Sequence, residues 1–151
     1  MLDDTDRRLL RQFQADPDLT TAGLAARCGL TTATCWRRLE KLQSAGVIEG
    51  QEVVINWAAM GYTVEVSLRF TLDKTLSRAF DEFLAAAREV PEVLEIQTFL
   101  GRVDVRLSVI ARDLAHYQTL YRDRILTLPH IADIEALMHI ARIKNDQGLP
   151  L

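Results

Sequence analysis

The sequence has only two cysteines, no long hydrophobic run and no basic leader, and each of these absences excludes a class of protein. Two cysteines, Cys28 and Cys35, do not form a disulfide framework. The longest apolar stretches fall far short of the roughly 18 residues that span a bilayer. The N-terminus is acidic where a secretory signal is basic and then apolar, so we expect a cytoplasmic protein.

The sequence also lacks the motifs that indicate a metal site or a cofactor site. The cysteines form no CxxC pair, and the three histidines, His116, His130 and His139, are scattered along the chain. The chain contains no glycine-rich phosphate loop and no nucleophile elbow. We therefore expect neither a bound metal nor a cofactor.

What the sequence does contain is an uneven distribution of charge. The 18 basic and 21 acidic side chains give a net charge of −3, which does not suggest nucleic acid as a partner. Positions 27–41, however, carry four basic side chains against a single acidic one, Glu40. A local cationic patch on a mildly acidic chain is the pattern that a function has to explain.

The first third of the chain predicts three helices. Apolar residues at helical spacing place them over about residues 3–15, 21–28 and 32–45. Gly29 lies between the second and the third, where a left-handed residue lets the chain turn sharply. A short helix joined through such a turn to a longer one is typical of a helix-turn-helix.

The third of these helices separates its side chains by type. At about 100° per residue, Cys35, Leu39 and Leu42 fall on one side and predict a buried stripe. The opposite side is basic and hydroxylated, which favours contact with phosphates and base edges of duplex DNA. An amphipathic helix with a solvated cationic face is the alternative. Trp36, on the flank, is expected to pack within the protein. The DNA contacts are expected from Thr31, Thr32, Thr34, Arg37, Arg38 and Lys41.

The rest of the chain contains an internal repeat. Residues 90–96 and 128–134 share an apolar-Pro-x-apolar-x-x-Ile pattern at an offset of 38 positions. Each copy lies in a unit of strand, helix, proline turn and strand, and two such units make a ferredoxin-like βαββαβ domain with helices on one face of the sheet. We interpret the open face as apolar and expect a partner subunit to cover it, which predicts a homodimer.

These patterns together predict an α+β protein in three parts. A three-helix helix-turn-helix domain occupies residues 1–50, and a linker arm follows over residues 51–62. A ferredoxin-like βαββαβ domain occupies residues 63–151 and is expected to carry oligomerisation.

Several short motifs also occur in a fixed order along the chain. They are Leu9-Leu10, Leu24-Ala25, Gly29-Leu30, the run Cys35 to Leu42, Gly46-Val47-Ile48, Gly101-x-x-Asp104 and the Leu128-Pro129-x-Ile131 turn. In this order they resemble the Lrp/AsnC (feast/famine) family of transcriptional regulators, and the resemblance covers nearly the whole chain.

The resemblance implies a dimer that binds double-stranded DNA and assembles further into tetramers or octamers. It also implies that the C-terminal domain, of the RAM type, binds a small effector, usually an amino acid. Carried over onto this sequence, the effector site comprises Leu100, Gly101, Arg102 and Asp104. A loop carboxylate suits an α-ammonium group, and glycine amides suit an α-carboxylate.

Three alternatives stay open at this point. Gly101 and Asp104 also fit a hairpin turn with a capping carboxylate. The same architecture resembles that of sirohaem decarboxylases, for which the candidate residues are Arg102, Arg106, His116 and His139. A DNA-compacting protein that responds to no effector is the third interpretation.

Overall fold

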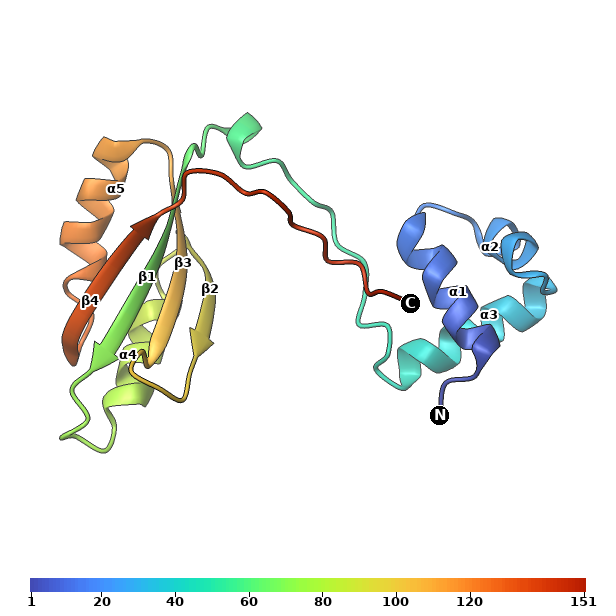
Figure 1. Ribbon diagram of the computed structural model, residues 1–151, viewed down its shortest axis with the longest axis horizontal. Helices are drawn as coiled ribbons and strands as arrows, with labels where there is room; N and C mark the ends of the chain where they lie inside the picture. Colours follow the sequence, from blue (N-terminus) through green and yellow to red (C-terminus); the bar gives the residue numbers. More distant parts are fainter. The chain divides into compact units, whose positions relative to one another are not determined.

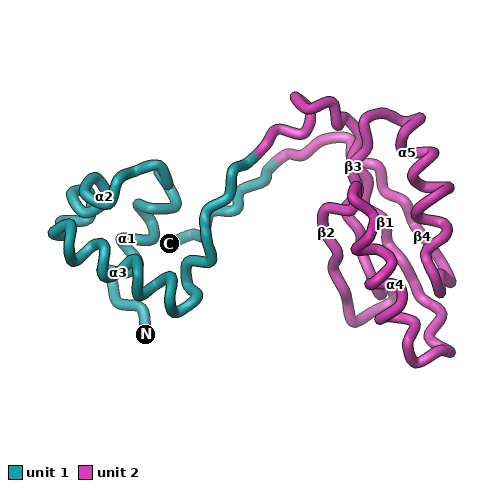
Figure 2. Tube along the Cα trace, turned by 180° about the vertical axis from the view of Figure 1, so that it is seen from behind, with its two compact units in different colours: residues 1–54, 144–151 teal, residues 55–143 magenta.

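The computed structural model describes all 151 residues, which form two compact units. Residues 1–54 and 144–151 make up the first unit, and residues 55–143 make up the second. The chain therefore passes between the units twice, as Figure 2 shows. None of the helices combines the length and the hydrophobicity needed to span a membrane.

Three helices form the first unit, as the sequence predicted: α1 (Asp4–Ala15), α2 (Thr21–Cys28) and α3 (Thr32–Ser44) (Figure 1). Each begins at a side-chain cap that accepts a backbone N–H three residues on. Gly29 ends α2 with a φ of 66°, the left-handed conformation that glycine adopts without strain. The core between the helices consists of Leu9, Leu24, Ala25, Cys28, Cys35 and Leu42.

The C-terminal residues complete the first unit by packing against α1. Arg11 Nε donates a hydrogen bond of 2.7 Å to the carbonyl oxygen of Leu151. The side-chain amide of Gln14 donates to the carbonyl of Leu149 and accepts from its N–H, at 2.6 and 3.0 Å. The sequence analysis assigned residues 144–151 to the second domain, whereas the structure groups them with the first.

The second unit contains a short 3₁₀ turn, η1 (Ala58–Met60), and then the predicted βαββαβ arrangement. Its elements are β1 (Val64–Leu72), α4 (Ala79–Arg88), β2 (Val93–Thr98), β3 (Val105–Ala111), α5 (Leu114–Leu120), a π-helical turn η2 (Tyr121–Ile125) and β4 (Ile131–Met138). The strands lie in the order β2-β3-β1-β4, and every neighbouring pair is antiparallel. Figure 1 shows α4 and α5 beside this sheet.

The core of the second unit lies between the sheet and its two helices. β1 contributes Val66, Leu68 and Phe70, all fully buried. The ring of Phe70 packs on that of Phe83 from α4, with 4.9 Å between the ring centroids. Because successive side chains along a strand point to opposite faces of the sheet, these three apolar residues all lie on the face that packs on the helices.

The opposite face of the sheet is mostly polar, so the prediction of an apolar open face was wrong. Between the core residues, β1 directs Glu65, Ser67 and Arg69 to this face, and Arg69 lies 4.0 Å from Glu135 of β4. The apolar residues of β1 that suggested an apolar open face are the ones that pack on the helices. The neighbouring strands place mostly polar residues beside them, although Ile110 lies opposite Glu65 and Leu137 lies opposite Ser67.

Candidate nucleic-acid interface and effector loop

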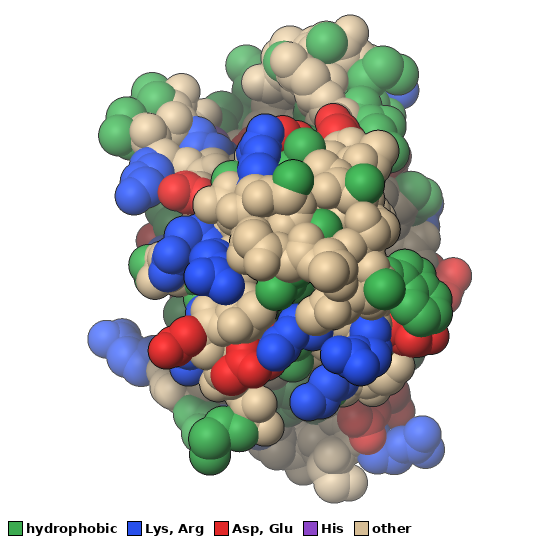
Figure 3. Space-filling view, turned by 90° about the vertical axis from the view of Figure 1, so that its right-hand side faces the viewer, with side chains coloured by type: hydrophobic (Ala, Val, Ile, Leu, Met, Phe, Trp, Pro, Cys, Tyr) green, Lys and Arg blue, Asp and Glu red, His purple; other side chains and the backbone are tan.

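The outer side of α3 presents two cations that no acidic side chain neutralises. Arg37 and Lys41 are both exposed and take part in none of the ion pairs of the chain. Cys35 and Leu42 are buried on the other side of the helix, and Leu39 is half-buried there, as the wheel predicted. Figure 3 shows Lys and Arg side chains standing out from the surface, with acidic side chains beside several of them.

The three threonines expected at the DNA differ in what they do. Thr31 caps α3: its hydroxyl accepts from the N–H of Thr34 at 3.2 Å and lies 2.9 Å from the Thr34 hydroxyl. These two hydroxyls are therefore engaged in holding the start of the helix. Thr32 is exposed in the first turn, where backbone N–H groups attract an anion.

Arg38 points back into its own unit. Its Nη1 lies 2.8 Å from an oxygen of Asp3 and 2.7 Å from an oxygen of Asp6. The two aspartates form a capping box at the start of α1, each accepting a backbone N–H from the other. The N–H of Asp6 and the Arg38 guanidinium hold the pKa of Asp3 below its ordinary value. Arg38 therefore links α3 to α1 through these ion pairs.

The two cysteines are free thiols in the core of the first unit. Burial raises the pKa of Cys28 and of Cys35 above the ordinary value for a thiol. A raised pKa keeps both sulfurs protonated and poorly nucleophilic, as expected for packing residues.

In the second unit, the loop between β2 and β3 is held by Asp104, which is 4% exposed. One carboxylate oxygen accepts from the N–H of Leu72 at 2.9 Å, and the other lies 3.0 Å from Lys74 Nζ. Burial alone would raise the pKa of Asp104, but the hydrogen bond from Leu72 and the charge of Lys74 outweigh it and lower the pKa. Both oxygens therefore already have partners.

The tip of the same loop is open. Leu100 is fully exposed, and Gly101 and Arg102 are exposed beside it. A Cβ placed on Gly101 would meet no atom within 4 Å, so nothing in this chain alone requires glycine there. The tip is tied to β1 through the hydroxyl of Thr71, which donates to the carbonyl of Arg102 at 2.9 Å.

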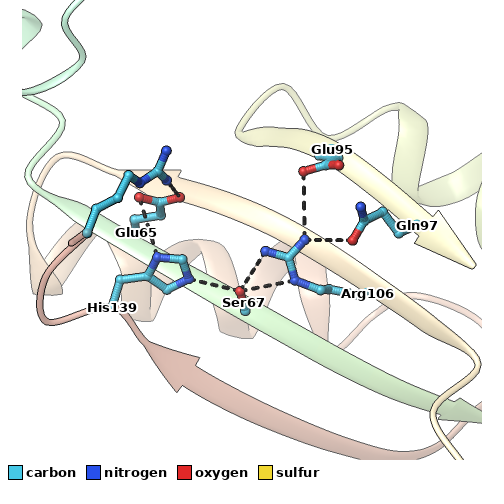
Figure 4. A network of polar contacts seen from close by, with 7 residues as sticks. Glu65, Ser67, Glu95, Gln97, Arg106 and His139 are labelled. Atoms are coloured by element: carbon cyan, nitrogen blue, oxygen red, sulfur yellow. Dashed lines mark hydrogen bonds and ion pairs between the residues drawn. The ribbon is translucent and has the colours of Figure 1, made fainter. Parts of the chain in front are cut away.

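A polar network on the open face of the sheet brings together two of the four residues considered for an enzyme (Figure 4). Arg106 donates through Nε and Nη2 to the hydroxyl of Ser67, at 3.3 and 3.0 Å. The same hydroxyl lies 2.9 Å from His139 Nε2, and His139 Nδ1 lies 3.5 Å from Glu65. His116 lies elsewhere, at the start of α5, where its Nδ1 accepts from the N–H of Arg112.

The order Ser67, His139, Glu65 is that of a hydrolase triad, but the hydroxyl is unsuited to attack. Its two lone pairs accept from Arg106, so its hydrogen is directed to His139. Ser67 is also only 6% exposed. The arrangement is that of a structural network on a sheet surface.

Several of these residues could not be found from the sequence pattern. Lys74 and Ser67 belong to no sequence motif. Their contacts arise only when the strands pair in the folded sheet. The partnership of Asp3 and Asp6 with Arg38 spans more than 30 positions. The only available signal was the presence of acidic residues in the first turn of a helix, which the helix dipole explains without any partner.

Known proteins match both units. Residues 2–49 match the winged helix-turn-helix DNA-binding family, and residues 65–149 match the Lrp/AsnC ligand binding domain. The proline dehydrogenase transcriptional activator of Rhodobacter capsulatus is 30% identical over 132 residues, covering 87% of this chain and 86% of that protein. The DNA-binding transcriptional activator DecR of Escherichia coli is 28% identical over 100% of this chain and 99% of its own length.

Solved structures agree along nearly the whole chain. An AsnC family transcriptional regulator from Agrobacterium tumefaciens superposes with a TM-score of 0.89 at 31% identity, covering 99% of this chain and 97% of that one. A transcriptional regulator of Neisseria meningitidis in complex with L-Met superposes with a TM-score of 0.91 at 25% identity and the same coverage.

The contacts of Asp104 predict how one substitution changes stability with pH. Because its pKa is lowered in the folded state, the ionised carboxylate contributes stability above the ordinary value of 3.8, and this contribution is lost as the pH falls through the lowered pKa. Asp104→Asn should therefore be less stable than the wild type at neutral pH, and the two unfolding curves should converge in acid.

Urea unfolding between pH 7 and pH 2 measures this difference. Asp18→Asn, which changes an exposed aspartate outside every ion pair, is the matched control and should follow the wild type at every pH. A constant difference between Asp104→Asn and the wild type down to pH 2 would contradict the proposed role of the carboxylate.

Proposed function

Because the chain belongs to the Lrp/AsnC family of transcriptional regulators, we propose that it regulates transcription by binding duplex DNA through α3 and an amino acid through its second unit. The observation that carries the DNA part is the exposure of Arg37 and Lys41, without acidic partners, on the helix that follows the Gly29 turn. In a helix-turn-helix this helix enters the major groove.

The residues of α3 divide into contacting and positioning groups. Arg37 and Lys41 neutralise phosphates or reach guanine edges, and Thr32 hydrogen-bonds a phosphate at the helix N-terminus. Arg38 sets the angle of α3 through its ion pairs with α1. Thr31 and Thr34 fix where the helix begins.

For the effector, we propose that the loop tip makes the contacts and that Asp104 supports it. The open space at Gly101 leaves room for a ligand beside the backbone amides, and Arg102 offers a cation to an α-carboxylate. The carboxylate of Asp104 has both oxygens occupied and holds the loop to Leu72 and Lys74. The relative from Neisseria meningitidis with L-Met, and the glutamate uptake regulatory protein of Zymomonas mobilis, support an amino acid as the class of effector.

One prediction separates the contacting residues Arg37 and Lys41 from the positioning residue Arg38. Arg37→Ala or Lys41→Ala should weaken duplex binding and lower the slope of log affinity against log salt by about 1, because each phosphate contact releases a counterion. Both should leave the free energy of unfolding nearly unchanged. Arg38→Ala should instead destabilise the first unit by about 2 kcal/mol, because it leaves Asp6 without its cation.

Electrophoretic mobility shifts over a salt series and urea unfolding of the same preparations measure the two effects. The DNA is a duplex selected by the wild-type protein from a random-sequence pool. Unchanged binding and salt dependence in both Arg37→Ala and Lys41→Ala would remove α3 from the interface.

A second prediction concerns the effector loop. At least one standard amino acid should raise the melting temperature of the wild type, because a ligand of the native state stabilises it. Gly101→Val should keep the melting temperature of the free protein, since a Cβ at this position would meet no atom within 4 Å, but should abolish the ligand-induced shift.

A thermal-shift screen of the standard amino acids makes both measurements. If no amino acid changes the wild-type melting temperature while DNA binding persists, the alternative of an effector-independent DNA-compacting protein is favoured. A shift that survives in Gly101→Val would place the ligand away from this loop.

We also propose that the protein is a homodimer through its second unit and that dimers associate into tetramers or octamers. The open face of the sheet carries both signs of charge, including Arg69, Glu135, Arg106 and Glu95. Such a face is able to pack against the same face of a second copy related by a two-fold axis. The cations of one copy then lie against the carboxylates of the other. Light scattering should therefore give at least twice the monomer mass of 17.1 kDa, and a monomer at micromolar concentration would contradict this assembly.

A further inference from the structure

Trp36 is the one large apolar side chain of α3 for which the fold of this chain provides no packing role. The sequence pattern predicted that it packs within the protein, but the structure leaves it 56% exposed. It belongs neither to the core cluster of the first unit nor to the partly buried residues around that core. Its indole N–H takes part in none of the hydrogen bonds of the chain. The burial of such an exposed tryptophan ring by a partner lowers the free energy of the complex.

Its position in α3 points to the nature of that partner. Trp36 is the fifth residue of a 13-residue helix, and it lies one turn after the exposed Thr32 and next to the exposed Arg37. In a helix-turn-helix, residues near the N-terminus of this helix contact base edges. The adjacent unpaired cation favours a polyanion over an apolar protein surface.

We propose that Trp36 is a base-reading residue that packs its indole against the 5-methyl group of a thymine in the major groove. This inference rests on the proposed DNA-binding function and adds a residue that determines sequence preference. Phosphate contacts from Arg37 and Lys41 attract any duplex, whereas an apolar ring gains most where a base presents a methyl group. Burying one methyl group changes an affinity by about fourfold.

The test compares thymine with uracil, which lacks only that methyl group. The probe is the tightest duplex that the wild-type protein selects from a random pool, with uracil replacing one thymine at a time. We expect one replacement to lower wild-type affinity about fourfold. Trp36→Ala should bind the original duplex roughly tenfold more weakly and should no longer distinguish uracil from thymine at that position. Trp36→Phe should keep part of both effects.

Two controls separate base reading from other causes. Trp57→Ala removes the other tryptophan, which lies in the second unit beside Arg142, and should leave the uracil effect intact. In a Trp57→Phe background, fluorescence reports Trp36 alone, and its emission should change when the selected duplex is added. The melting temperature of Trp36→Ala should match that of the wild type, since an exposed ring contributes little to the core.

The outcomes are distinguishable from failure of the proposed function. If the wild-type protein selects no duplex, both proposals fall. If it does but no uracil replacement weakens it, or if Trp36→Ala loses affinity equally on thymine and uracil duplexes, DNA binding stands and base reading by Trp36 is wrong. An unchanged emission of Trp36 on duplex addition, with altered light scattering in Trp36→Ala, would assign the ring to a protein interface instead.

Discussion

The ion pair between Arg38 and the aspartates at the start of α1 is the contact on which the proposed interface depends. A helix that reads DNA has to be held at a defined angle, and hydrophobic contacts through Cys35 and Leu42 restrain it along one line only. The guanidinium adds a polar restraint on the flank, with two short contacts to Asp3 and Asp6. Because the same aspartates cap α1, one cation links the start of that helix to the middle of α3.

The second unit uses the same device at its loop. Asp104, just before β3, contacts a backbone N–H at the end of β1 and a lysine side chain just beyond that strand. In each unit a shielded carboxylate fixes an exposed segment from behind. The residues offered to a partner, such as Arg37 and Leu100, are then left free of intramolecular partners. Binding sites need this arrangement, in which rigid elements hold the contacting residues and those residues stay free for a ligand.

Local patterns predicted the elements, and long-range pairings explain what they missed. Helical spacing and the turn at Gly29 were sufficient for the first unit, and the repeated proline turns were sufficient for the ferredoxin-like sheet. The polar open face was missed because alternation in β1 does not tell what β3 and β4 place beside it. Arg38 and Asp104 were expected to contact ligands, and the sequence could not show that each already has a partner of opposite charge in the fold.

The packing of residues 144–151 on α1 makes the first unit discontinuous in the sequence, which matters during synthesis. The ribosome releases the three helices of the first unit first, yet Arg11 and Gln14 gain their last partners only after the whole second unit has been translated. In a nascent chain, the first unit therefore lacks these contacts until residues 144–151 have been translated. Removal of residues 144–151 would take hydrogen-bond partners from Arg11 and Gln14 of α1, which lie far from them in the sequence.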